Sequence, residues 1–109
     1  MTIESFRQLA LSFPGSTEQP HFEKLSYRLN NKIFATLDVV QGRACIKLDE
    51  VTQSVFSSAA PAIIYHVNNK WGKQGWTLVE LSATRKPLVR EMLQLGFDSI
   101  GMKKKTASK

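Results

Sequence analysis

The segment from Asn68 to Trp76 holds the residue types best suited to binding chemistry, because Lys70 and Lys73 flank Trp71 there. Lysine side chains can neutralise phosphates, which gives binding that weakens as salt is added. An exposed indole can stack on a nucleic-acid base or wedge into a groove. The same segment also fits a structured turn, in which two glycines permit the backbone path and the two tryptophans fill the core. The sequence leaves both interpretations open.

A second group of cations lies on a predicted hairpin, where Lys24 and Arg28 share strand parity and Lys32 follows the turn. If the tips of this hairpin and of the 68–76 segment face the same way, four cations form one patch with Trp71 as its aromatic member. The candidate nucleic-acid-binding residues are therefore Arg28, Lys32, Lys70, Trp71 and Lys73. The alternative is an ordinary solvated strand face.

Patterns for catalysis or metal binding are missing from the sequence. A zinc site needs three or four convergent ligands with close pairs, and His21, Glu23, Cys45 and His66 form no such set. No nucleophile elbow, phosphate loop or dinucleotide motif is present. His66 is expected to bond a backbone carbonyl. We therefore predict that the protein is not an enzyme and uses no metal or cofactor.

The length of 109 residues suits one domain, and the charge is unevenly distributed. The formal net charge is +6, yet residues 1–54 are neutral and residues 1–100 carry only +2. Four lysines lie in the acid-free end of the chain, at 103–105 and 109. We predict one domain over residues 1–101 and a flexible basic tail over residues 102–109.

No apolar run approaches the ~18 residues that a membrane helix needs, and the N-terminus lacks the layout of an export signal. We therefore expect a cytoplasmic protein that does not contact membranes. Cys45 is the single cysteine, so no disulfide can form within the chain. Its place in an alternating apolar run predicts a buried structural thiol.

The hydrophobic pattern predicts three helices and five strands. Val51, Val55 and Phe56 should mark the buried side of the middle helix. Alternation should place Ala35 on one face of its strand and Phe34 on the other. The predicted order is helix 3–12, a three-stranded antiparallel meander within 24–48, helix 50–59, strand 62–67, loop 68–75, strand 76–81 and helix 85–99. This order (α-β-β-β-α-β-β-α) indicates a two-layer α+β domain with helices on one face of an antiparallel sheet.

Several short motifs resemble those of the MmcQ/YjbR-like family, and the resemblance covers about residues 3–100. The motifs are Phe13-Pro14-Gly15, Glu18-Gln19-Pro20-His21-Phe22, Ser26-Tyr27-Arg28, Lys32-Ile33-Phe34-Ala35-Thr36-Leu37 and Asn69-Lys70-Trp71-Gly72-Lys73-Gln74-Gly75-Trp76-Thr77. The resemblance implies a bacterial protein with the YjbR-like fold. It also implies a DNA-binding module with two hairpin wings and no established catalytic residue.

Two functions of different kinds remain open. The first is DNA binding through the basic hairpin loops, without catalysis. The second is a chaperone-like domain that binds a protein or small ligand in a concave apolar patch lined by Tyr65, Trp71 or Phe22. An uninterrupted positive stripe across both hairpin tips would favour the first, and a mixed-charge surface with an apolar groove the second. We expect DNA or a protein as the partner, and a monomer.

Overall fold

The computed structural model describes the backbone of residues 1–107 and the side chains of residues 1–100. Its elements are α1 (Ile3–Leu11), β1 (Thr17–His21), β2 (Lys24–Leu29), β3 (Lys32–Asp38), β4 (Arg43–Lys47), α2 (Glu50–Ala59), β5 (Ile64–His66), α3 (Lys70–Lys73), β6 (Trp76–Glu80), the 3₁₀ turn η1 (Leu81–Ala83) and α4 (Lys86–Ala107).

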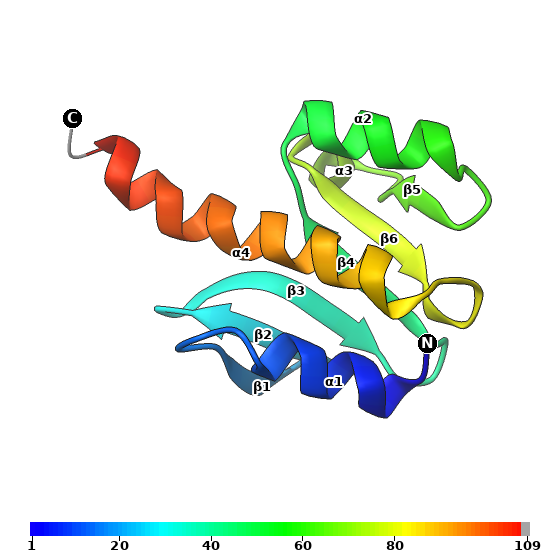
Figure 1. The fold of residues 1–109 in the computed structure, drawn as a ribbon, viewed down its shortest axis with the longest axis horizontal. Helices are drawn as coiled ribbons and strands as arrows, with labels where there is room; N and C mark the ends of the chain where they lie inside the picture. The colour runs from blue at the N-terminus through cyan, green and yellow to red at the C-terminus, as the bar shows by residue number, and fades with distance from the viewer. Residues whose placement is uncertain (108–109) are drawn as a thin grey trace.

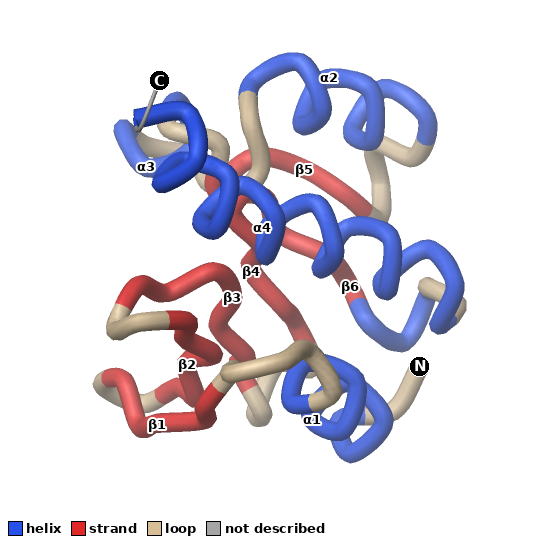
Figure 2. The backbone as a smooth tube through the Cα atoms, turned by 60° about the vertical axis from the view of Figure 1, so that its left-hand side comes forward, coloured by secondary structure: helices blue, strands red, loops and turns tan. Residues whose placement is uncertain are grey.

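One antiparallel sheet contains all six of these strands, in the order β1-β2-β3-β4-β6-β5. The three longer helices cover one face of the sheet, and α4 lies between α1 and α2 (Figures 1 and 2). The predicted α+β class, the order of the elements and the coverage of a single face are confirmed. No helix in the described part of the chain is long and apolar enough to cross a membrane.

Local sequence signals explain where the helices and hairpins begin and end. The Thr2 hydroxyl accepts from the Ser5 amide at the start of α1, and the Asp49 carboxylate accepts from the Thr52 amide at the start of α2. These contacts satisfy amides that would otherwise lack partners in the first turn. Asn30 and Asn31 have φ values of 52° and 66°, as a tight β2–β3 turn requires.

The core lies between the helices and the covered face of the sheet, and aromatic contacts join the two layers. Phe13 stacks on Phe97 at a centroid distance of 5.1 Å, and both rings contact Phe34 edge-on. The prediction that Phe34 and Ala35 lie on opposite faces is wrong. Phe34 contacts the rings on the helix side, and Ala35 pairs with Ile46, which faces α4 on that same side. The β2–β3 register shifts between Tyr27 and Arg28, and such irregularities break simple alternation.

The buried side of α2 also differs from the prediction. Val51 and Val55 are 74% and 63% exposed, whereas Phe56 packs against the core. Gln53 points inward instead, where its side-chain amide donates to the carbonyl oxygens of Gly72 and Trp76. The helix turns a polar residue toward the sheet because the loop beneath it presents backbone carbonyls that need donors.

The structure adds three elements to the predicted order: β1, the one-turn helix α3 and η1. β1 contains Pro20 and no alternating apolar pattern, and it occupies the edge of the sheet, where a proline is tolerated. The backbone of α4 continues through Ala107, beyond the end of the predicted helix. The expectation of a flexible tail stays a prediction, and residues 108–109 lie outside the described residues.

A hydrogen-bonded ion pair joins α1 to the edge strand β1. The Arg7 guanidinium donates to both Glu18 carboxylate oxygens at 2.9 and 3.0 Å, and the Tyr27 hydroxyl donates to Glu18 Oε2 at 2.7 Å. The Arg7 hydrogen bonds hold the pKa of the Glu18 carboxyl below its ordinary value of 4.5. Burial and the bond to Glu18 raise the pKa of Tyr27. This two-pronged geometry fixes the orientation of both partners.

We predict that Glu18→Gln destabilises the fold at neutral pH and that the difference from wild type shrinks at acid pH. A carboxyl whose folded pKa is lowered stabilises the protein above its unfolded pKa, and this contribution is lost as the pH falls through the folded value. Urea unfolding of both proteins at pH 7 and pH 3 measures the effect. A destabilisation that stays constant between the two pH values would contradict it.

Candidate functional site

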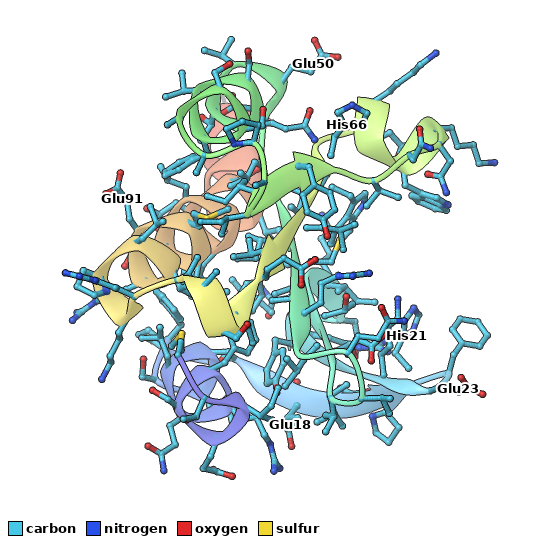
Figure 3. All side chains as sticks on the ribbon, turned by 90° about the vertical axis from the view of Figure 1, so that its right-hand side faces the viewer. Glu18, His21, Glu23, Glu50, His66 and Glu91 are labelled. Carbon is cyan, nitrogen blue, oxygen red and sulfur yellow. The ribbon has the colours of Figure 1, made fainter. Side chains whose placement is uncertain are left out.

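The face of the sheet opposite the helices is open, and it forms a groove of about 960 Å³. Figure 3 shows this face on the right, with His21 and Glu23 on the β1–β2 hairpin below and His66 on β5 above. The groove therefore runs across the sheet between its two edges. Its floor comes from β3, β4 and β6, through Ile33, Thr36, Cys45, Trp76 and Leu78.

The composition of the floor follows from strand alternation. On β4 and β6, Ala44, Ile46 and Val79 are fully buried on the helix side, and Cys45 and Leu78 between them point into the groove. Trp76 lines the groove as well. The earlier interpretation that both tryptophans fill the core is therefore wrong, because helices cover only the other face.

Phe22 forms one rim of the groove, at the β1–β2 turn. Its side chain is 92% exposed, and its ring contacts His21 edge-on at a centroid distance of 4.8 Å. Its φ of 59° lies in the left-handed region, which costs a residue with a Cβ about 1–2 kcal/mol. A large aromatic residue thus occupies a strained position where it contributes little to the core.

Trp71 forms the opposite rim, on the short helix α3. Its side chain is 49% exposed, and Lys70 Nζ lies 5.8 Å from the ring centroid. The Asn69 side chain accepts from the Trp71 amide at 2.8 Å, which caps the turn. Trp71 and Phe22 both line the groove, so residues 49 positions apart in sequence flank one cavity.

Two glycines let the α3 loop lie directly on neighbouring backbone. A Cβ on Gly72 would collide with the Val67 carbonyl, and a Cβ on Gly75 would collide with the Leu48 carbonyl. Gly75 also has a φ of 102°, which side chains rarely adopt. Its carbonyl accepts from the Leu48 amide at 2.9 Å. Close backbone contact therefore sets where Trp71 stands.

The acidic groups of the open face differ in their partners. Glu80 accepts from Arg43 Nε at 3.0 Å and from the Tyr65 hydroxyl, and this second bond raises the pKa of Tyr65. Asp38 Oδ1 accepts from the Gln41 amide at 3.0 Å. Glu23, at the Phe22 turn, is exposed. The groove thus combines an apolar floor with charges of both signs.

Four cations around the open face make no salt bridge within the described part of the chain. They are Lys24, Arg28, Lys70 and Lys73. Lys24 lines the groove. Arg28 shares the face of Lys24, because its Nε donates to Ser26 Oγ at 3.0 Å. Positive charge without acidic partners is therefore present on the open side of the molecule, as it is on α4, where Lys86 and Arg90 also make no salt bridge to a described residue.

The structure brings the predicted site residues together only in part. Trp71 lines the groove, and Lys70 and Lys73 stand on the same helical turn. Lys32 instead borders a smaller depression of about 390 Å³ near Lys47. Sequence reasoning placed neither Lys24 nor Phe22 in the nucleic-acid site. The available signal for Phe22 was an aromatic residue at the turn that follows the polar edge strand β1.

The remaining chemistry of the open face is modest. Burial raises the pKa of the Cys45 thiol from 9.0 to about 11, although the Lys24 charge opposes this. His66 Nδ1 lies 3.0 Å from the Val67 carbonyl oxygen, as expected for a strand histidine that bonds the backbone. Among the described residues, no three His, Cys, Asp or Glu side chains gather as metal ligands.

A two-layer α+β domain with one bare sheet face is the class that the fold and groove define. The model of the YjbR family matches residues 11–98, and the chain belongs to that family. A solved structure, that of Deinococcus radiodurans protein DR2400 with its DUF419 domain, is similar to this chain. The TM-score is 0.74 at 25% identity, over 88% of this chain and 75% of that one. No curated protein matches the chain. The family is not a known enzyme family.

We predict that Gly75→Ala destabilises the fold by about 3 kcal/mol or more, since it adds a clash to an unfavourable φ. Gly42→Ala is the matched control, because Gly42 also has a positive φ of 67° but nothing within 4 Å of its added Cβ. The control should lose only about 1 kcal/mol. Urea denaturation measures both, and equal losses would show that the backbone contact is unimportant.

We also predict that Cys45 reacts slowly with iodoacetamide. The thiolate is the reactive form, and a pKa of about 11 rather than 9.0 lowers its fraction about 100-fold near pH 8. Mass spectrometry can follow the rate from pH 7 to pH 11, where it should still be rising. A rate at pH 8 equal to that of the urea-unfolded chain would contradict the prediction.

Proposed function

We propose that this protein is a non-catalytic nucleic-acid-binding module whose binding surface is the open face of the sheet. The observation that carries the proposal is an aromatic-rimmed groove surrounded by four cations, Lys24, Arg28, Lys70 and Lys73, that make no salt bridge in the described part of the chain. Each lysine or arginine near a phosphate releases a condensed counterion, which favours binding at low salt. We assign Lys70, Lys73 and Arg28 to phosphates and Trp71 to a base, and we assign Lys32 to a phosphate beyond the groove, because it borders a separate depression.

The absence of catalysis is part of this proposal. Catalysis needs a positioned acid or base together with an activated group. Two groups of the open face that could serve are otherwise engaged: Glu80 bonds Arg43 and Tyr65, and the Cys45 thiol is held in its protonated form. These contacts support a surface that binds without converting what it binds.

Binding of a protein or small ligand is the second candidate. Its supporting observation is the apolar floor, which has the mixed-charge surroundings expected for that function. The groove volume also lies near the upper end of the range for small-ligand pockets. This candidate does not account for Lys70 and Lys73, which stand outside the groove on an exposed turn.

We predict that Lys70→Ala/Lys73→Ala weakens binding to labelled oligonucleotides of any sequence. The slope of log affinity against log salt should become shallower by about 1.4 for single strands and 1.8 for duplexes. Fluorescence anisotropy between 50 and 300 mM salt measures it. The matched control is Lys86→Ala/Arg90→Ala, which removes two exposed cations from α4 on the helix-covered side.

Two outcomes would count against the proposal. If wild-type protein binds neither single strands nor duplexes at low salt, nucleic-acid binding is wrong. If both double variants shift the slope equally, the open face has no special role. A third variant, Lys103→Gln/Lys104→Gln/Lys105→Gln, measures how much of the affinity comes from the C-terminal lysines alone.

A further inference from the structure

We infer that the groove accepts a single-stranded nucleic acid, with unpaired bases stacked against Phe22 and Trp71 and phosphates held by the surrounding cations. The inference rests on the proposed function and specifies its ligand. A single strand can satisfy two features of this surface that a duplex would not satisfy together. The floor of the groove is apolar, yet Lys24 at one rim and Lys70 and Lys73 near the other make no salt bridge to a described residue.

Phe22 is the residue that folding explains least. It is almost fully exposed, it adopts a left-handed φ, and its ring packs edge-on against the neighbouring His21. Backbone strain of this kind gathers at functional sites, because the surrounding structure must maintain it. The β1–β2 turn holds the Phe22 ring at the mouth of the groove, where a flat apolar ligand group can stack on it.

Trp71 provides a second platform on the far rim, and Trp76 adds aromatic surface to the floor between them. Lys70 lies over the Trp71 ring, so the phosphate of a base stacked there would meet an ammonium group. Stacking of bases on aromatic side chains tolerates any sequence, because every base has a π-face. Sequence-tolerant binding is therefore expected.

The cations are placed to follow a backbone across the face. Lys24 stands in the groove near Phe22, Arg28 lies further along the same strand, and Lys70 and Lys73 stand at the opposite rim. A strand whose bases enter the groove would carry its phosphates past these side chains. Glu23, exposed beside Phe22, is the unfavourable charge along this path.

A duplex would use this surface poorly. Its bases are paired and stacked on one another, so it presents a charged backbone and base edges rather than base faces. Set against the open face, it would leave the apolar floor facing phosphates and the two rim aromatics without stacking partners. A single strand exposes both phosphates and base faces, which is what the aromatic rims and the cations together accommodate.

The test compares four labelled probes of about 12 nucleotides by anisotropy with the full chain: a mixed-sequence DNA strand, its RNA counterpart, its DNA duplex and an abasic DNA strand of equal charge. Both base-bearing single strands should bind at least about ten-fold tighter than the abasic strand, and the duplex should bind more weakly than either. The DNA and RNA arms show which source of single strand is preferred.

Variants connect the result to the groove. Phe22→Ala and Trp71→Ala should each weaken single-strand binding at least about five-fold while leaving abasic-strand binding unchanged, and Phe22→Tyr should restore it. The matched control is Val40→Ala, which truncates a 93% exposed apolar side chain on the β3–β4 turn, outside the groove lining. Circular dichroism of each variant checks that it folds.

Protection of Cys45 gives an independent readout, because its thiol is in the groove floor. A bound single strand should slow alkylation of Cys45 at about pH 8.5, where the lysines that hold its phosphates stay charged, whereas the abasic strand should not. Duplex binding equal to or tighter than single-strand binding would overturn the inference while leaving the proposed function standing. The inference would also be overturned if Phe22→Ala and Trp71→Ala bound single strands as tightly as Val40→Ala does. Failure of every probe to bind would instead remove the proposed function itself.

Discussion

The packing of three helices on a single face of the sheet is the constraint from which the remaining features follow. Phe13, Phe34 and Phe97 join the two layers on that face, and the buried residues of β4 and β6 point the same way. Alternation then sends every second residue of these strands to the uncovered side. An antiparallel sheet tolerates this arrangement, because one of its faces can meet water. A face left open in this way can hold a binding surface without disturbing the core.

The two rims of the groove are held by different physical means. On one side, the pairing of β1 with β2 and the ion pair from Arg7 to Glu18 secure the edge hairpin that ends in Phe22. On the other, Gly72 and Gly75 let the loop backbone touch the sheet, and Gln53 bonds the carbonyls of that loop from α2. Membership of the YjbR family and the likeness to the DR2400 structure agree with this architecture.

The electrostatics of the open face complement its shape. Glu80, an acidic group near the floor, is engaged with Arg43 and Tyr65, whereas four cations on the same side, Lys24, Arg28, Lys70 and Lys73, have no acidic partner in the part of the chain that the structure describes. Arg43 is neutralised locally, so the excess of positive charge comes from the hairpin strand and the α3 turn. A ligand that carries negative charge along its length and flat apolar groups beside it would satisfy both the rims and the floor.

Local signals were enough to predict much of the fold. Capping by Thr2 and Asp49, left-handed turns at Asn30 and Asn31, and alternation on β4 and β6 depend on residues a few positions apart. Prediction failed where a distant partner decided the outcome. Val51 and Val55 look like a buried stripe, yet the carbonyls of the α3 loop turn Gln53 inward, and a register shift places Phe34 in the core.

The sequence likewise determined one part of the candidate site, and the tertiary structure decided the other. The sequence by itself determined which residues can do chemistry, namely lysines beside an aromatic ring, and it excluded metal and catalytic motifs. It also determined that one sheet face would be covered by helices. Only the tertiary structure decided that Phe22 and Trp71 flank one groove and that Lys32 borders a separate depression. The physical reason is that spacing along a strand sets which face a side chain takes, whereas strand order and curvature set which distant loops meet.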